Sequence, residues 1–186
     1  MFTEINKIVE VLAAGGVILY PTDTIWGLGC DATNAAAVAK IYDIKQRVAS
    51  KSMIMLLAEP KDVFKYVMSP PLDIVSIIQS FASPTTVIYD GAVNLAPNVV
   101  AEDGSVGIRV TKDPFCKTII KRFKRPLVST SANISGNASP QYFKEIDEAL
   151  LSLVDYVVAY RQNDDALHKQ SSIIRFLEDG TIEKIR

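Results

Sequence analysis

Short apolar runs, separated by segments of helical periodicity, are the feature that most limits the folds open to this chain. An apolar run of roughly four to eight residues bounded by turn residues is typical of a buried β-strand. Several runs follow one another with no helical segment between them, which a purely parallel sheet does not allow because its crossovers are long. We therefore predict an α/β fold of the α+β type, in which a twisted mixed sheet carries helices on its faces. The predicted strands are residues 17–20, 53–57, 85–89, 106–110, 126–129, 155–160, 171–176 and 181–185.

Helix signals flank these strands. Apolar residues recur at helical spacing from Ile5 to Leu12, and a second helix follows Thr33 or Asn34, either of which can cap it. Asp113-Pro114 supplies a cap followed by proline at the first helical position of a third helix. The other predicted elements are a helix over residues 62–80 with a break at 70–71, a helix over residues 139–150 and a hairpin turn at residues 179–180.

The composition favours one domain over residues 1–186. The 20 Lys and Arg residues against 21 Asp and Glu residues give a formal net charge of −1, which excludes a globally basic nucleic-acid coat. No apolar run approaches the ~18 residues of a membrane span, and the N-terminus lacks a secretory signal, so we expect a cytoplasmic protein with no membrane association. Cys30 and Cys116 lie far apart in the sequence and predict neither a disulfide framework nor a zinc site.

Common catalytic signatures are missing from the sequence. It contains no G-x-x-x-x-G-K-[ST] phosphate loop, and Gly27-Leu28-Gly29 lacks the third glycine of a dinucleotide loop. It contains no G-x-S-x-G, and His168, the only histidine, is interpreted as a solvated loop residue. These absences argue against phosphate-loop enzymes and serine hydrolases.

Three polar segments lie at the ends of predicted strands or helices: residues 20–29, 45–51 and 129–136. The first and third are rich in hydroxyl groups, and the second carries three cations within seven residues. Each taken singly can be a turn, a solvated charge run or a Ser/Thr-rich loop. Taken together at strand ends, where sheet proteins build sites, cations and hydroxyls suit a polyanion such as a nucleoside triphosphate.

Four motifs within and beside these segments carry a resemblance. They are P-T-D-T-I-W-G-L-G at residues 21–29, K-Q-R at 45–47, S-V-G-I-R-V at 105–110 and S-T-S-A-N-I-S-G at 129–136. In this order and spacing the chain resembles the YrdC/Sua5 family of threonylcarbamoyl-AMP synthases over nearly its whole length. The resemblance implies a single YrdC-like catalytic domain over residues 1–186, without the additional C-terminal Sua5 domain.

The resemblance implies a nucleotidyltransferase that makes L-threonylcarbamoyladenylate and pyrophosphate from L-threonine, bicarbonate or CO2, and ATP. The product would supply N6 of adenosine 37 in tRNAs that read ANN codons. Other proteins of this family's pathway make that transfer, so a transient hand-over to tRNA threonylcarbamoyl-transfer proteins is expected, together with weak tRNA binding. No tightly bound cofactor is implied, and Mg²⁺ would enter with ATP rather than through a dedicated metal site.

The resemblance also assigns roles to individual residues. The assigned catalytic residues are Lys45 and Arg47, the ATP-binding residues are Arg47, Lys51, Ser105, Ser131, Ser139 and Arg186, and the threonine-binding residues are Thr24, Arg109, Ser129 and Ser171. Fixed cations would offset the repulsion between a carboxylated threonine and the triphosphate. An arginine can also form a two-pronged pair with a carboxylate. Because Lys45 and Arg47 complete no predicted apolar face, we expect Lys45→Ala and Arg47→Ala to cripple synthesis and leave the fold intact.

Two alternatives belong to other functional classes. The first is an RNA-binding module of the same fold without turnover, suggested by the positive cluster Lys121, Arg122, Lys124 and Arg125. A solvated helix C-terminus also favours such cations, so the cluster alone does not decide. The second is a carbamoyl-transferring domain such as that of hydrogenase maturation proteins, but the sequence contains none of their zinc-finger-like or acylphosphatase segments.

Overall fold

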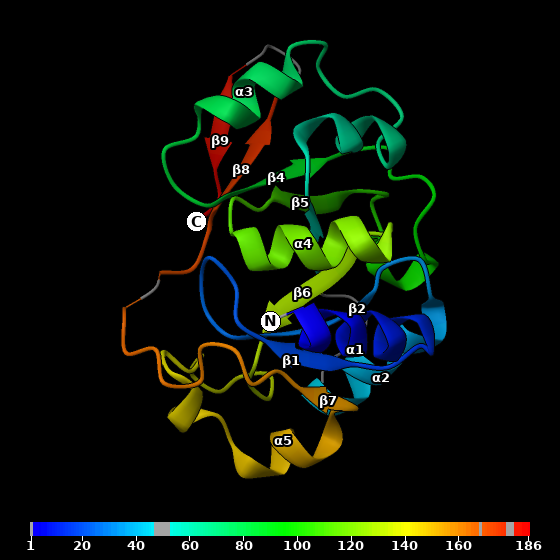
Figure 1. Cartoon of the computed structure of the whole chain (residues 1–186). Helices are drawn as coiled ribbons and strands as arrows, with labels where there is room; N and C mark the ends of the chain where they lie inside the picture. Colours follow the sequence, from blue (N-terminus) through cyan, green and yellow to red (C-terminus); the bar gives the residue numbers. More distant parts are fainter. Residues whose placement is uncertain (1, 47–52, 168, 178–180) are drawn as a thin grey trace.

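The computed structural model describes residues 2–46, 53–167, 169–177 and 181–186. Its strands form one nine-stranded sheet in the order β7-β1-β2-β6-β3-β5-β4-β8-β9, which crosses the whole molecule (Figure 1). The strands are β1 Ile18–Tyr20, β2 Gly27–Asp31, β3 Ile54–Leu57, β4 Thr85–Tyr89, β5 Val106–Val110, β6 Leu127–Ser131, β7 Tyr156–Val157, β8 Ser172–Phe176 and β9 Ile182–Lys184.

Parallel and antiparallel pairs are mixed within this sheet. The pairs β1–β7, β3–β5 and β4–β8 are parallel. The pairs β1–β2, β2–β6, β3–β6, β4–β5 and β8–β9 are antiparallel. The predicted twisted mixed sheet with helices on its faces is therefore confirmed.

Helices cover both faces of the sheet. They are α1 Phe2–Ala13, α2 Ala35–Lys45, α3 Ile74–Ser80, α4 Pro114–Phe123 and α5 Glu148–Leu153, with 3₁₀ turns at Pro60–Lys65, Pro97–Val99 and Phe143–Glu145. Helices α1 and α4 lie together in front of the sheet in Figure 1 and share an apolar cluster with β3 residue Leu56. Met55 and Leu57 belong to the other cluster, with α2 and α3, because successive side chains of a strand point to opposite faces.

Two helix starts form as the sequence predicts. Asn34 caps α2 by accepting hydrogen bonds from the amides of Ala36 and Ala37. Asp113 caps α4 by accepting from the amide of Cys116, with Pro114 at the first helical position.

Other predicted elements are shorter than expected. Residues 62–80 contain a 3₁₀ turn and the seven-residue α3, separated by a long irregular stretch around the two prolines. The helix predicted over 139–150 is wrong in its first half, because α5 begins only after Asp147, whose carboxylate accepts from the amide of Ala149. The strand predicted over 155–160 is reduced to β7. The hairpin turn predicted at 179–180 lies outside the described residues.

Candidate active site

A cavity of about 260 Å³ opens on the face of the sheet that also carries α1 and α4. Leu56 and its β6 partner Leu127 belong to the apolar cluster beneath these helices. Ile54 lies two residues before Leu56 in β3, and its β6 partner Ser129 lies two residues after Leu127. Both side chains point to the same face of the sheet as the two leucines, but they line the cavity. The cavity therefore begins where the helices stop covering the sheet. Its lining residues are Thr24, Ile25, Trp26, Gly27, Met53, Ile54, Thr86, Ile88, Ser105, Gly107, Arg109, Ser129, Thr130, Ser131, Gln170, Ser171, Ile173 and Arg186.

Glycines leave space above the sheet at the cavity and beside it, because they have no side chain. Gly107 pairs with Ile54 and Ile88 on the neighbouring strands and adds no side chain to the cavity floor. Gly29 pairs with Ser129, and a Cβ at Gly29 would lie 2.6 Å from Cε1 of Tyr20. The ring of Tyr20 can therefore lie against residue 29 of the neighbouring strand β2 only because that residue has no side chain.

Gly29→Ala is expected to destabilise the fold. An added Cβ meets the buried Tyr20 ring at 2.6 Å, and such overpacking lowers the free energy of unfolding by about 1–3 kcal/mol. Gly107→Ala is the matched control in the same sheet, since its Cβ would meet nothing nearer than Cγ2 of Thr86 at 3.3 Å. Urea denaturation of both variants measures the difference, and equal losses would contradict the close approach of the Tyr20 ring.

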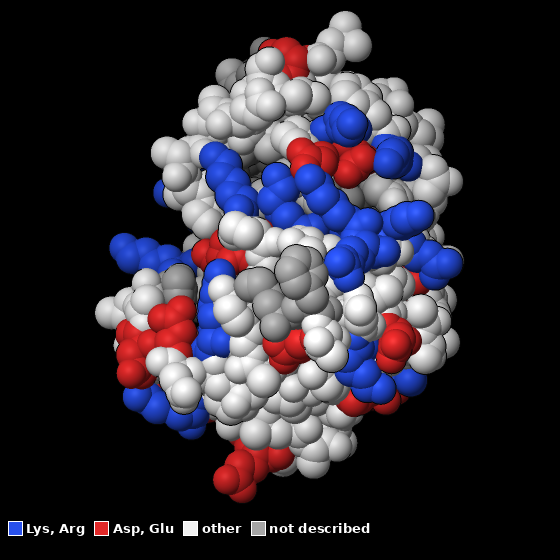
Figure 2. Space-filling view, viewed as in Figure 1, with Lys and Arg blue, Asp and Glu red and all other residues white. Residues whose placement is uncertain are grey.

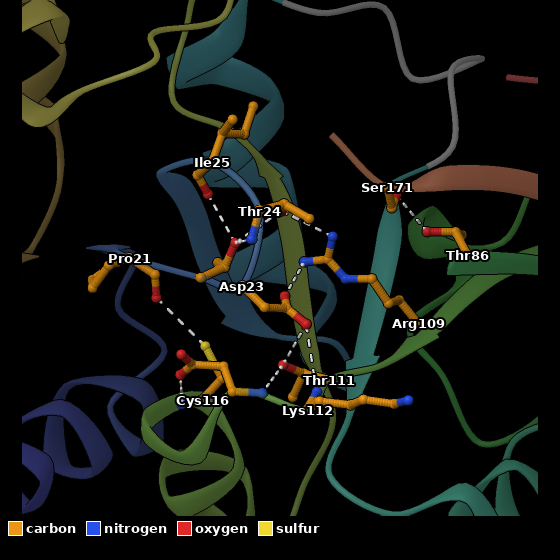
Figure 3. Close-up of polar contacts among 12 residues, drawn as sticks. Pro21, Asp23, Thr24, Ile25, Thr86, Arg109, Thr111, Lys112, Cys116 and Ser171 are labelled. Carbon is orange, nitrogen blue, oxygen red and sulfur yellow. Dashed lines mark hydrogen bonds and ion pairs between the residues drawn. The ribbon is translucent and has the colours of Figure 1, made fainter. Parts of the chain in front are cut away.

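Arg109 is the buried cation of the cavity. Its side chain is 4% exposed, and its Nη1 donates to Oγ1 of Thr24 at 2.9 Å while Nη2 lies 3.3 Å from Oδ1 of Asp23 (Figure 3). Asp23 Oδ2 in turn accepts from the Thr111 hydroxyl at 3.0 Å. The Arg109 Nε is buried and has no hydrogen-bond partner among the described atoms. An unpartnered donor on a buried guanidinium at a cavity wall suits an anionic ligand such as a carboxylate.

The wall opposite Thr24 is formed by β4 and the start of β8. The hydroxyls of Thr86 and Ser171 lie 2.9 Å apart, and Arg186 donates from Nε and Nη2 to the Ser171 carbonyl oxygen. Burial, and to a smaller extent the positive charge of Arg109, lower the pKa of Arg186 below its usual range. The positive charges of Arg109 and Arg186 thus repel each other at this cavity, and a bound anion would offset that repulsion.

Lys45 lies behind the cavity rather than in its wall. The residue is 2% exposed, and its Nζ donates to the carbonyl oxygens of Ser131 and Asn133 at 2.6 and 2.7 Å and contacts Oδ1 of Asn133 at 3.2 Å. Its own carbonyl accepts from the amide of Ser135. These contacts contradict the expectation that Lys45→Ala leaves the fold intact, because the last residue of α2 holds the end of β6 and the segment that follows it.

The structure brings most of the predicted site residues together. Those that line this cavity are Thr24, Ser105, Arg109, Ser129, Ser131, Ser171 and Arg186. Ser139 lies outside it, but its Oγ accepts from Nε2 of Gln170, which lines the cavity. Arg47 and Lys51 lie outside the described residues.

Several lining residues carry no predicted role. Thr86 and Ile88 alternate with buried Val87 in β4, so the period of the strand could have assigned them to the cavity face. The Asp23 carboxylate also lacked an assigned role, although it directly precedes the predicted site residue Thr24 in the first motif. Gln170 gives no signal in the sequence, since its position depends on how the chain returns to β8.

The positive cluster considered for RNA binding lies on and after α4, where Figure 2 shows Lys and Arg side chains gathered across this face. Lys121 and Lys117 both pair with Glu59, at 2.6 and 3.4 Å, and hydrogen bonding from Lys121 lowers the pKa of that carboxyl. Arg125 pairs with buried Asp31 at 2.8 Å. Much of this charge is thus compensated within the fold.

The described residues contain no group of three or more His, Cys, Asp or Glu side chains that could hold a metal ion. Over the same residues, no helix has the length and apolar character needed to cross a membrane.

Comparison with known families gives a match over most of the chain. The family model Sua5_yciO_yrdC, described as "Telomere recombination", matches residues 10–186. A protein of Stenotrophomonas maltophilia (strain K279a) named threonylcarbamoyl-AMP synthase is 32% identical over 157 residues, which cover 83% of this chain and 84% of that protein. The protein of the same name from Psychromonas ingrahamii is 35% identical over 136 residues, 72% of this chain and 71% of that protein.

Solved structures share the fold. P. abyssi Sua5 complexed with L-threonine superposes with a TM-score of 0.84 and 22% identity, covering 98% of this chain. This chain spans about half the length of that protein, 53%. E. coli YciO superposes with a TM-score of 0.82 and 23% identity, covering 98% of this chain and 87% of YciO. The mixed sheet, the cavity lined by residues of three of the four motifs and the match over residues 10–186 agree, and the chain belongs to the Sua5/YciO/YrdC family.

Proposed function

We propose that this protein is a threonylcarbamoyl-AMP synthase, a nucleotidyltransferase that joins L-threonine, bicarbonate or CO2, and ATP. The observation that carries the proposal is the buried Arg109 with an unpartnered Nε, set among hydroxyls in a cavity that also holds Arg186. This arrangement suits two anionic substrates that must be held against their mutual repulsion. The relatives that share most of the chain are named threonylcarbamoyl-AMP synthases.

The threonine end of the proposed site is the wall that contains Arg109. Its guanidinium would pair with the amino-acid carboxylate, a two-pronged geometry that lysine cannot provide. Thr24 and Ser129 line the same cavity and would contact the rest of the amino acid, with Ser171 opposite. The ion pair with Asp23 holds Arg109 in place before substrate enters.

The ATP end is proposed on the side of Ser105, Ser131 and Arg186. Arg47 and Lys51 are proposed to bind the phosphates. Ser139 is proposed to contribute to ATP binding through its hydrogen bond with Gln170. Mg²⁺ would arrive with ATP as part of the substrate. The Lys45 ammonium has three protein acceptors, so a direct contact with phosphate would require it to give up at least one of them.

The proposed reaction needs no covalent enzyme intermediate. The threonine amine adds to the carbon of CO2, or to bicarbonate with loss of water, and gives a carbamate. A carbamate oxygen then attacks the α-phosphorus of ATP, and the bond to the β-phosphate oxygen breaks to release pyrophosphate. The cations stabilise the charge that develops on the transferring and leaving groups. We further propose that the adenylate passes, in the cytoplasm, to proteins that modify adenosine 37 of tRNA, and that any tRNA contact of this chain is weak.

The proposal is tested by measuring pyrophosphate release in the presence of ATP and bicarbonate with different amino acids. Release should require L-threonine, should be weaker with serine and should be far slower with valine. The reason is that a site built to bond a hydroxyl is left with an unpaired buried group when valine binds. Pyrophosphate release without an amino acid, or equal rates with valine and threonine, would contradict the proposal. ATP-independent, strongly salt-dependent tRNA binding without any turnover would instead support the RNA-binding module.

A further inference from the structure

We propose that Thr22 is a positioning residue that makes the Thr24 hydroxyl an acceptor only toward the cavity, so that the bound amino acid must donate a hydrogen bond to it. The inference rests on the proposed threonine site and adds the direction of the hydrogen bond there. Thr22 is buried, 4% exposed, and is not among the residues that line the cavity. Thr24 does line the cavity and is 5% exposed.

The single hydroxyl proton of Thr22 is used in a hydrogen bond to a backbone carbonyl oxygen. Its Oγ1 lies 2.8 Å from the carbonyl oxygen of Ile25, which can only accept, so Thr22 donates there. The same Oγ1 accepts from the backbone amide of Thr24 at 3.0 Å. Thr22 therefore has no proton left for any other partner.

The direction in which the Thr24 hydroxyl donates its proton follows from this assignment for Thr22. The two threonine Oγ1 atoms lie 2.9 Å apart, so one must donate to the other. Since the Thr22 hydroxyl donates its proton to the Ile25 carbonyl oxygen, Thr24 is the donor to Thr22. The Thr24 Oγ1 also accepts from Nη1 of Arg109 at 2.9 Å (Figure 3). A hydroxyl has one proton and two acceptor sites, so one acceptor site of Thr24 remains for a ligand.

A Thr24 hydroxyl that can only accept from the ligand would distinguish ligands by their hydrogen-bonding groups as well as by their shape. The hydroxyl of threonine can turn its proton toward Thr24, whereas an ether oxygen in the same place would put two acceptors face to face. Arg109 enforces the same direction, because its Nη1 occupies the other acceptor site of Thr24 and cannot accept a proton from it. Removing the Thr22 hydroxyl would free the Thr24 proton to turn into the cavity.

The test compares two ligands of matched shape in three proteins. O-methyl-L-threonine and L-isoleucine have similar outlines, but only the first has a side-chain oxygen, and that oxygen can only accept. Wild type, Thr22→Val and Thr22→Ser are titrated with each in competition with L-threonine. Fluorescence of Trp26, the only tryptophan and a cavity residue, reports binding.

In wild type and Thr22→Ser, O-methyl-L-threonine should bind no more tightly than isoleucine, because its ether oxygen would face the acceptor site of Thr24. In Thr22→Val, O-methyl-L-threonine should bind about tenfold more tightly than isoleucine, because Thr24 can then donate to the ether oxygen. Equal binding of the two analogues to Thr22→Val, including no binding of either, overturns the proposal. A clear preference for O-methyl-L-threonine in wild type overturns it as well.

A second measurement covers the case in which Thr22→Val does not fold. Neutron diffraction of the deuterated wild-type protein locates both hydroxyl deuterons: that of Thr22 is expected toward the Ile25 carbonyl, and that of Thr24 toward Thr22. A Thr24 deuteron that points into the cavity overturns the proposal. Failure of wild type to bind L-threonine contradicts the proposed threonine site, and the deuteron positions then still decide whether Thr24 is an acceptor only.

Discussion

Lys45→Ala is expected to lower the free energy of unfolding by about 3 kcal/mol or more. The variant removes a buried ammonium and three charge-assisted hydrogen bonds. The Asn133 carbonyl oxygen then loses its donor, whereas the Ser131 carbonyl oxygen and Oδ1 of Asn133 each keep one other donor. A hydrogen bond to a charged group contributes about 1.5–3 kcal/mol, and an acceptor left unsatisfied costs about 1–3 kcal/mol, less where water can enter. Urea denaturation followed by circular dichroism measures the change.

Lys40→Ala is the matched control, since it makes the same substitution on the same helix. The Lys40 side chain is about half exposed; its Nζ donates to the Gly15 carbonyl at 3.0 Å and lies 3.9 Å from the Asp155 carboxylate. Partly exposed contacts of this kind contribute less than about 1 kcal/mol. Equal effects of the two substitutions, or a fully stable Lys45→Ala protein, would contradict the structural role of Lys45.

Arg109→Lys is expected to raise the KM for threonine by about 30- to 100-fold while changing the KM for ATP less than about threefold. A lysine ammonium cannot form two parallel bonds to a carboxylate, and it also loses the fixed contacts to Thr24 and Asp23. A charge-assisted hydrogen bond contributes about 1.5–3 kcal/mol, or about 12- to 150-fold in affinity, and the expected change lies within these limits. Two titrations, threonine at saturating ATP and ATP at saturating threonine, measure the split.

Arg186→Lys serves as the comparison, because Arg186 lines the same cavity but is proposed to face the nucleotide. It should change the KM for ATP more than the KM for threonine. If Arg109→Lys shifted both constants equally, Arg109 would not belong to the amino-acid end of the site.

The parts of the fold that local sequence could predict are those with a local cause. The strand β4 and the α4 start at Asp113-Pro114 follow from short apolar runs and from a cap followed by proline. β2 was not expected, because its sequence Gly27–Asp31 contains two glycines and an aspartate. That strand forms because β1 and β6 lie on either side of it and bond its backbone.

Only part of the candidate site could likewise be predicted from the sequence. The motifs placed Thr24, Arg109 and Ser129 in one cavity, although they come from three separate parts of the chain. The burial of Lys45 was not predicted, because lysine at the end of a helix is usually solvated. Its environment is created by the segment after β6, some 86 to 88 residues away in sequence, so no local pattern around Lys45 could have indicated it.

The measurement that tests the central claim most directly is mass spectrometry of the nucleotide product. The wild-type protein is incubated with ATP, Mg²⁺, L-threonine and isotopically labelled bicarbonate. We predict a new adenylate whose mass accounts for AMP, threonine and one added carbonyl carrying the label, formed together with an equal amount of pyrophosphate. An adenylate of threonine without the labelled carbon, or release of pyrophosphate with AMP as the only nucleotide product, would contradict the account.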